Sequence, residues 1–169
     1  MSAPAAPVRT TVVGLGTMAV STDACERLIT YALGSCLGVA LYDPLARVGG
    51  LAHVMMPSST MDPERARESP LAFVDSGVPA LFRECYRAGA AKDRLLVKVA
   101  GGATTAAEGD ADQFQIGKRN LLMLRRLLWR NEVLIHAHDV GGVRISRTMT
   151  LAVASGDVMV RANGVDRRL

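Results

Sequence analysis

The sequence predicts a single α+β domain built from stacked layers. Patterns typical of β-strands outnumber those typical of helices, and the strand patterns often follow one another in pairs with only a short turn between them, which favours α+β layers over a doubly wound parallel sheet. The chain has 169 residues, 49% of them hydrophobic, and this is enough to bury a sizeable core in one domain. Aromatic residues make up only 4%, so Val, Leu, Ala and Met must fill that core.

The N-terminal third is expected to contain mainly strands. A short β-branched segment at 11–14 predicts the first strand, and 17–31 carries a less regular strand signal. The segment 37–42 is apolar almost throughout, as in a strand buried on both faces, and it ends at Asp43-Pro44. A second apolar segment follows the Gly49-Gly50 pair and ends before Pro57, so we expect two neighbouring strands joined by a short connection.

Helices and strands alternate in the remainder. Residues 58–70 and 103–115 are predicted to be loops. The apolar residues 78, 81, 82 and 85 form one helical stripe, with Ser76 as the expected N-cap and Gly89 as the stop. A second helix is expected over 120–131. Further strands are expected at 95–100, 133–139, 143–153 and 158–160, with Gly156-Asp157 as a hairpin turn before the last of them.

Composition and short sequence signals indicate the location and the kinds of partner that are expected for this protein. Residues 1–9 are expected to be a flexible tail, and 10–169 the folded domain. The start has no basic region followed by an apolar one, no apolar run is long enough to span a membrane, and the three cysteines lack CxxC spacing, so we expect a cytoplasmic protein without disulfides. The net charge of +4 is spread along the chain, which predicts no nucleic-acid partner. It is consistent with a solvated basic face or an acidic protein partner.

Cys36 is the first candidate for chemistry. It follows the small residues Gly34 and Ser35 at the entrance of an apolar strand, where nearby backbone N–H groups can face a substrate. Because the thiolate is the reactive form and an ordinary thiol has a pKa of about 8.5, such a cysteine needs a base or a positive neighbour. By spacing alone, Cys36 can also be read as a small buried hydrophobic residue.

His53 is the second candidate, because it interrupts the apolar segment 51–56. A titratable ring in a core strand must find a hydrogen-bond partner, and a strand next to that of Cys36 would bring the ring within reach of the thiol. The alternative is a core histidine with a purely structural hydrogen bond.

The other histidines and cysteines carry weaker signals. His136 and His138 alternate along one predicted strand, but a third metal ligand is not evident, and we interpret them as exposed or capping residues. Cys85 lies on the helical apolar stripe and Cys25 has no recognisable context, so neither is expected to be catalytic.

Eight segments together form a specific pattern, and they cover nearly all of the chain beyond its first ten residues: TYALGSCLGVALY (30–42), Asp43-Pro44, GGLAHVMMP (49–57), Phe73-Val74-Asp75, Gly89-Ala90, KVAGGA (98–103), IGKRN (116–120) and DVGGVR (139–144). In these segments, and in their order, the chain resembles the CheD family of chemoreceptor glutamine deamidases.

This resemblance implies a Cys–His pair supported by a threonine, which falls on Cys36, His53 and Thr30. It also implies a three-layer α/β/β fold, an oxyanion held by backbone N–H groups around Ser35 and Cys36, and no metal or organic cofactor. The implied partners are the cytoplasmic helices of methyl-accepting chemotaxis proteins and a CheC-type phosphatase. Two other functions stay open at this point: a non-enzymatic regulator of that phosphatase, and a cysteine hydrolase acting on small amides.

Overall fold

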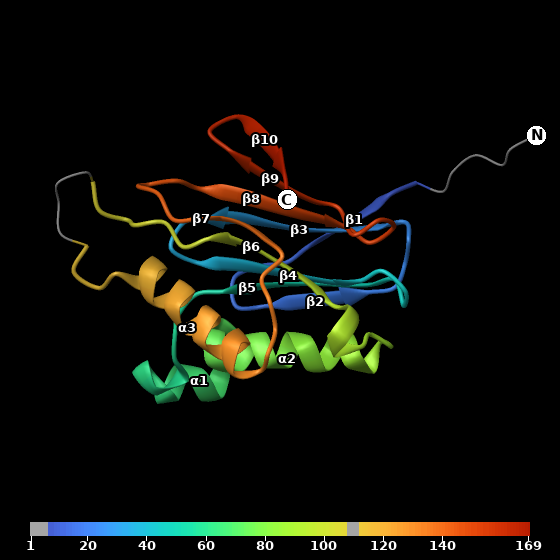
Figure 1. Ribbon diagram of the computed structural model, residues 1–169. Helices are drawn as coiled ribbons and strands as arrows, with labels where there is room; N and C mark the ends of the chain where they lie inside the picture. The colour runs from blue at the N-terminus through green and yellow to red at the C-terminus, as the bar shows by residue number, and fades with distance from the viewer. Residues whose placement is uncertain (1–6, 108–111) are drawn as a thin grey trace, which may run out of the picture.

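The computed structural model describes residues 7–107 and 112–169, which form three layers (Figure 1). The first layer is a five-stranded sheet, sheet A, in the order β1 (Arg9–Val12), β3 (Glu26–Leu33), β8 (Arg147–Ala152), β9 (Val158–Ala162) and β10 (Val165–Arg168). The middle layer is sheet B, in the order β2 (Met18–Ser21), β5 (Val48–Val54), β4 (Leu37–Asp43), β6 (Leu96–Gly101) and β7 (Ala137–Val140). The third layer contains α1 (Pro63–Glu68), α2 (Val74–Arg87) and α3 (Ile116–Arg130). The expected α+β fold with α/β/β layers is therefore confirmed.

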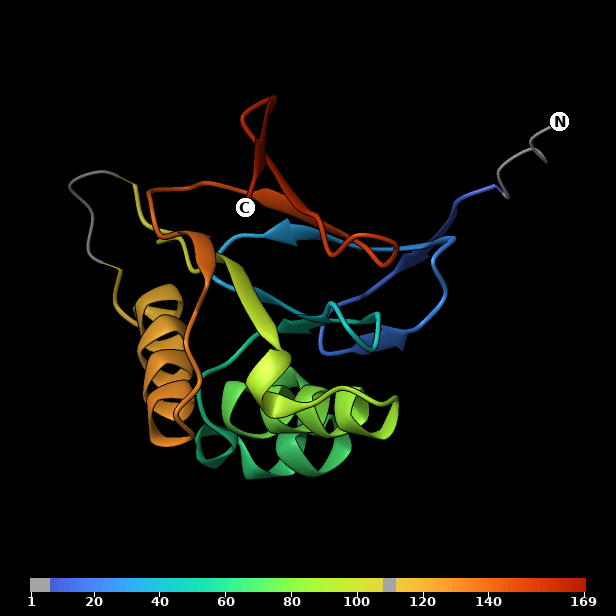
Figure 2. The same cartoon turned by 45° about the vertical axis from the view of Figure 1, so that its right-hand side comes forward.

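The central strands of sheet B are buried on both faces because one face meets the helices and the other meets sheet A (Figure 2). Along β4 and β5 the side chains alternate between two apolar cores. Leu37, Val39 and Val54 pack in the core under the helices, whereas Ala40 and Leu51 pack in the core between the sheets. Two cores on either side of one sheet explain why these strands are apolar throughout.

The predicted hairpin of two apolar strands is present as β4 and β5. They pair antiparallel from Leu37 opposite Val54 to Asp43 opposite Val48. Gly49 and Gly50 are small for a packing reason, because a Cβ on Gly50 would lie 2.6 Å from the Cys85 sulfur on α2, and one on Gly49 would crowd Val153 of the layer opposite. The paired glycines thus let both neighbouring layers approach β5 closely.

Several boundaries differ from the sequence predictions. The segment predicted as a loop at 58–70 contains α1 and a 3-10 turn at Ser59–Met61, and a further 3-10 turn follows at Pro70–Ala72. Helix α2 begins at Val74 rather than after Ser76, so Pro79 lies in its second turn, and the Ser76 hydroxyl donates to the Pro70 carbonyl instead of capping the helix. Helix α3 starts at Ile116, four residues before the expected 120.

The C-terminal strands also differ from expectation. Strand β7 covers 137–140 rather than 133–139, and β8 starts at 147 rather than 143. Strand β10 was not predicted, although Asn163-Gly164 is a strong hairpin signal and both residues have positive φ here (50° and 76°). The first strand takes in Arg9, the last residue assigned above to the tail. Residues 1–6 of that tail and 108–111 of the predicted loop 103–115 lie outside the described residues.

A buried ion pair holds the end of the β4–β5 hairpin to the α2–β6 connection. The carboxylate of Asp43 is inaccessible to solvent, and it accepts hydrogen bonds from the guanidinium of Arg94 and from the backbone N–H groups of Leu45, Ala46 and Ala91. Burial by itself would raise the pKa of Asp43, but these donors outweigh it and hold the pKa well below its usual range.

No helix among residues 7–107 and 112–169 is both long enough and apolar enough to cross a membrane.

We predict that Asp43→Ala lowers the free energy of unfolding by at least about 2 kcal/mol, because hydrogen bonds to a charged group contribute roughly 1.5–3 kcal/mol each. Urea unfolding at pH 7 measures this loss. Because the folded pKa is depressed, the contribution of Asp43 is present above its unfolded pKa of about 3.9 and is lost as pH falls below it. The difference between the two proteins should therefore shrink in acid, and a difference independent of pH down to 2 would contradict the assignment.

Candidate functional site

Two buried polar residues meet in the layer between the two sheets, and a half-buried cysteine lies on the neighbouring segment. Thr30 lies on β3 of sheet A and His53 on β5 of sheet B, and both side chains are buried, with 0% and 1% exposure. Cys36 precedes β4 and is half-buried. Because His53 pairs directly with Gly38 on β4, the residue two positions before Gly38 is its diagonal neighbour on the same face of the sheet. That residue is Cys36.

A β-bulge puts Leu33 on the same face of β3 as Thr30, which already faces the interior by alternation with Leu28. The β3–β8 register shifts between Thr30, opposite Met149, and Leu33, opposite Arg147, so β3 contains one extra residue there. Ala32, inside the bulge, has a left-handed φ of 57°. As a result Thr30 and Leu33, three positions apart, both face the core between the sheets.

Gly38 leaves the space that this arrangement needs. A Cβ at Gly38 would lie 2.8 Å from both the Leu33 side chain and the Met149 sulfur, and 3.5 Å from the Thr30 methyl group. Any side chain opposite His53 would therefore push aside the ends of the Leu33 and Met149 side chains, next to the position where Thr30 approaches the ring.

The hydrogen bonds of Thr30 determine the tautomer of His53. The Thr30 hydroxyl donates to the Val13 carbonyl at 2.7 Å and lies 2.8 Å from His53 Nδ1. A hydroxyl has one proton, and a carbonyl can only accept, so the Thr30 oxygen must accept from Nδ1–H. In the neutral ring the proton is then on Nδ1, and Nε2 carries a free lone pair.

His53 Nε2 is buried and has no hydrogen-bond partner among the described residues. The structure brings Thr30 and His53 into direct contact and places Cys36 just before the adjacent strand β4, with no hydrogen bond between Cys36 and His53. A buried ring nitrogen without a partner is costly in a structural histidine, whereas a general base requires such a lone pair.

Burial keeps both reactive groups neutral. It raises the pKa of the Cys36 thiol, an effect that the neighbouring Cys36 backbone N–H partly offsets. It also lowers the pKa of His53. Both shifts disfavour charge, so the resting pair is a thiol and a neutral imidazole rather than a thiolate and an imidazolium.

The turn before β4 carries backbone donors beside the thiol. In the described part of the chain, the Ser35 N–H donates to no other group and the Cys36 N–H faces its own sulfur, whereas the carbonyls of Gly34 and Cys36 accept from Ala103 and Gly102. Backbone N–H groups beside a thiol are of the kind that can stabilise an oxyanion.

Asn120 holds this turn in place and was not recognised from sequence as part of the site. It is fully buried in the second turn of α3, and its Nδ2 donates to the carbonyls of Ser35, at 2.9 Å, and Met55, at 3.1 Å. Its Oδ1 is buried without a partner among the described residues. The sequence signal that could have indicated this role is a single amide side chain within an otherwise apolar helical face. The two carbonyls that it binds lie 85 and 65 residues away along the chain, so no local pattern could identify them.

The remaining candidates lie outside this site. Cys85 is buried beneath α2, and burial together with the Glu84 charge raises its pKa to about 12. Cys25 lies in the turn before β3. His136 accepts a hydrogen bond from the Val97 N–H through Nδ1 at 3.0 Å, while His138 is exposed on β7.

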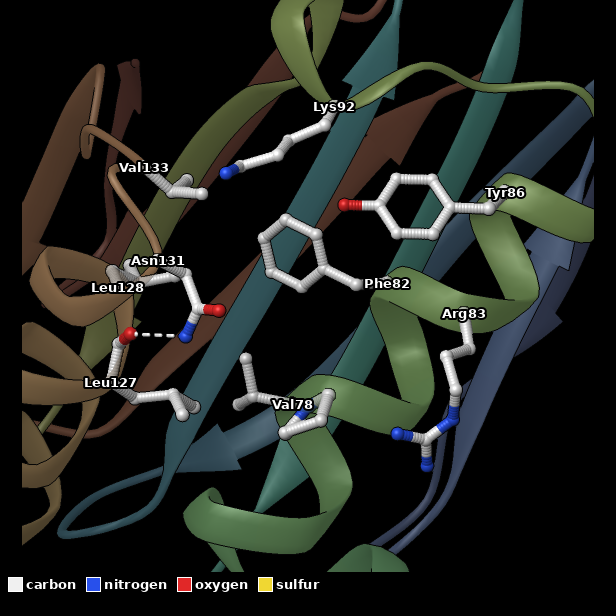
Figure 3. Close-up of a pocket in the computed structure, with 10 residues that line it drawn as sticks. Val78, Phe82, Arg83, Tyr86, Lys92, Leu127, Leu128, Asn131 and Val133 are labelled. Carbon is white, nitrogen blue, oxygen red and sulfur yellow. Dashed lines mark hydrogen bonds between the residues drawn. The ribbon is translucent and has the colours of Figure 1, made fainter.

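A hollow of about 220 Å³ lies between α2 and α3, lined by Phe82, Tyr86, Lys92 and Leu127 among others (Figure 3). The helices that line it cover the face of sheet B opposite to the one that carries His53. This hollow is therefore separate from the Cys36 site.

The comparisons with family models and with curated proteins agree with one another. Residues 55–162 match the family model described as CheD chemotactic sensory transduction. A protein of Syntrophus aciditrophicus named Probable chemoreceptor glutamine deamidase CheD 1 is 43% identical over 153 residues, covering 90% of this chain and 94% of the relative. A Solibacter usitatus protein named Probable chemoreceptor glutamine deamidase CheD is 42% identical over 158 residues, covering 94% and 92%. Among solved structures, a Neisseria meningitidis protein is similar with a TM-score of 0.43 and 8% identity, covering 80% of this chain and 63% of that one.

We predict that the Cys36 thiol titrates above the ordinary value of about 8.5. The rate of Cys36 alkylation by iodoacetamide, followed by mass spectrometry of its peptide against pH, should rise with a midpoint above that of free cysteine, because burial disfavours the thiolate. His53→Ala should leave this midpoint nearly unchanged, since neutral His53 does not stabilise a thiolate. A midpoint below 7 that His53→Ala abolishes would instead indicate a preformed ion pair.

We predict that Asn120→Leu, which removes both donated hydrogen bonds, loosens the turn and exposes the thiol. The alkylation midpoint of Cys36 should then move down toward 8.5, and the rate at pH 7 should rise severalfold. Leu124→Ala, one turn further along α3 and also fully buried, is the matched control. It should cost about 2–5 kcal/mol of stability without moving the alkylation curve. Equal curves for Asn120→Leu and the unsubstituted protein would show that Asn120 does not position the turn.

Proposed function

This chain belongs to the CheD family, and we propose that it deamidates chemoreceptor glutamines with Cys36 as nucleophile, His53 as general base and Thr30 as the residue that orients the imidazole. The observation that carries this proposal is the buried Thr30–His53 hydrogen bond, which leaves the Nε2 lone pair free on the strand beside Cys36. The reaction belongs to the amidohydrolase class, in which water converts a side-chain amide into a carboxylate and ammonia.

In the first half of the proposed reaction, His53 Nε2 takes the proton of the Cys36 thiol as the sulfur attacks the carboxamide carbon of the glutamine side chain. The carbonyl electron pair moves to the oxygen, and the N–H groups of Ser35 and Cys36 donate to this oxyanion. A comparable donor elsewhere stabilises the transition state by about 3 kcal/mol. The intermediate collapses to a thioester, and His53 gives its proton to the departing ammonia.

In the second half, a water molecule attacks the thioester carbon while His53 Nε2 takes its proton. The C–S bond breaks, the thiolate regains the proton from His53, and glutamate leaves. Throughout both halves Thr30 accepts from Nδ1–H and so keeps the same tautomer and ring orientation, as the third member of other triads does. Every proton in this scheme moves through His53, and the scheme therefore requires no metal or organic cofactor.

The proposed substrate is a protein, the cytoplasmic helices of a chemoreceptor, and this places the enzyme in the cytoplasm. Half-burial of Cys36, with His53 and Thr30 behind it, is consistent with a side chain reaching in from the surface. Deamidation replaces a neutral amide with a carboxylate and so changes the charge of the receptor surface. A CheC-type phosphatase remains a second proposed partner, and regulation of it without turnover is the alternative function.

Mass spectrometry of purified receptor cytoplasmic fragments tests the proposal. We expect a gain of about 1 Da at particular glutamines with the unsubstituted protein, as amide-to-acid chemistry requires, and none with Cys36→Ala. Thr30→Val, nearly isosteric, should lower kcat at least about tenfold with a small change in KM, since it removes an orienting bond rather than a substrate contact.

Two further measurements separate the alternatives. The regulatory function would be favoured by two results together. The unsubstituted protein would leave every receptor fragment unchanged, and it would bind a CheC-type phosphatase as tightly as Cys36→Ala does. Hydrolysis of free glutamine at a rate similar to that of receptor glutamines would favour a hydrolase of small amides.

A further inference from the structure

The outward surface of α3 has an unusual composition. Every exposed side chain of this helix is either cationic or large and apolar, and we call this set the α3 outer face: Lys118, Arg119, Leu122, Arg125, Arg126, Trp129 and Arg130. Leu122 is 54% exposed and Trp129 is 80% exposed. Figure 2 shows α3 at the edge of the molecule, with its outer side turned away from the sheets.

The cations of the α3 outer face lack counter-charges on their own helix, which contains no Asp or Glu. Elsewhere in the described residues, arginines such as Arg94, Arg147 and Arg161 form ion pairs with aspartates, but no residue of the α3 outer face does so. Arg126 and Arg130, four positions apart, repel one another. An acidic partner would relieve this repulsion and would be steered toward the surface.

The spacing of the α3 outer face suits a helical partner. Lys118 and Arg125 repeat after seven residues, as do Arg119 and Arg126, and the apolar pair Leu122 and Trp129 runs between the two cationic rows. A helix of 15 residues is about 22 Å long. An apolar seam flanked by charge at a seven-residue period is the pattern by which two helices pack side by side, and the complementary helix carries acidic residues beside its own apolar seam.

The N-terminal end of α3 lies beside the Cys36 site. The N-terminal part of α3 supplies Asn120, which binds the Ser35 carbonyl, and Gly117, where a Cβ would lie 2.3 Å from the Ala103 carbonyl oxygen. A hollow of about 450 Å³ lies at this end of the helix, between α3 and the turns at 102–104 and 141–142, with Lys118, Leu122 and Arg125 on its wall. A helix lying along α3 would therefore reach the turn at 102–104, where the Gly102 N–H donates to the Cys36 carbonyl.

We propose that the α3 outer face docks an acidic amphipathic helix of the substrate protein and thereby presents a glutamine to Cys36. This inference rests on the proposed deamidase function for its choice of partner. The inner face of α3 is buried against sheet B, so only Leu122 and Trp129 remain for insertion into a lipid surface, which is a small apolar area for membrane binding. Trp129 is the single aromatic group among the cations, whereas a surface that binds single-stranded nucleic acid usually offers several for base stacking. Both facts favour a protein helix over a membrane or a nucleic acid.

Charge reversal tests the docking surface. The variant Arg125→Glu/Arg126→Glu is compared with Arg167→Glu/Arg168→Glu, which makes the same change in net charge on β10, at the outer edge of sheet A (Figure 1). Deamidation of a receptor cytoplasmic fragment is followed by mass spectrometry at several salt concentrations. Binding of the same fragment is measured in a Cys36→Ala background, and iodoacetamide alkylation of Cys36 reports whether the site is intact.

We expect the α3 variant to raise KM and the dissociation constant at least about tenfold and to weaken their salt dependence, with Cys36 alkylation unchanged, while the β10 variant stays within about twofold of the unsubstituted protein. Equal effects of the two variants, or none, would overturn the docking proposal. Binding of phosphatidylserine vesicles or duplex DNA that competes with the fragment and is lost in the α3 variant would overturn the choice of partner.

The failure of the underlying function gives a different result. If the unsubstituted protein changes no glutamine but the Cys36→Ala background still binds the fragment through α3, the docking surface stands and the deamidase function does not. If deamidation occurs and KM is insensitive to Arg125→Glu/Arg126→Glu, the function stands and the docking surface does not.

Discussion

The hydrogen bond between Thr30 and His53 joins the two sheets through their shared core, and the chemistry of the site depends on it. Both partners are buried, so each would carry an unpaired polar group if the sheets separated or slipped in register. The Thr30 hydroxyl donates its only proton to the Val13 carbonyl, so it can only accept from His53 Nδ1–H. The Thr30–His53 hydrogen bond therefore also determines that Nε2 is the nitrogen that remains free. One contact between layers thus sets the spacing of the sheets at this point and the protonation pattern of the ring.

The backbone around this contact explains several residues that would otherwise seem unrelated. The bulge at Ala32 turns Thr30 and Leu33 to the same side, and Gly38 leaves the room that they occupy. The turn that carries Cys36 is held to sheet B and α3 by backbone hydrogen bonds and by Asn120. A small thiol at the rim of an apolar layer is therefore placed by rigid elements on three sides, as a preorganised site requires.

Helix α3 has a buried face in the domain core and an exposed face on the surface, and the two have different roles. Its buried residues belong to the domain core, and Asn120 among them holds the turn of Ser35 and Cys36, while its exposed residues form the cationic surface that we propose for docking. The same helix would then connect binding of a substrate helix to the position of the reactive turn. Burial disfavours the charged forms of Cys36 and His53, and this fits the proposed reaction, which begins from a thiol and a neutral imidazole.

The sequence by itself determined the strand-rich layered class and the β4–β5 hairpin, and it marked Cys36 and His53 as residues out of place in apolar strands. These are local properties, because apolar alternation, Asp43-Pro44 and paired glycines act within a few positions. The predicted role of Thr30 followed from the family resemblance rather than from the residues next to it in the sequence. Tertiary structure alone decided that Thr30 meets His53, that Asn120 holds the Ser35 turn, and that α2 begins at Val74 rather than after Ser76. Each of these depends on pairing or packing between segments that are distant in the chain, and no local pattern encodes the register or the layer spacing that brings such segments together.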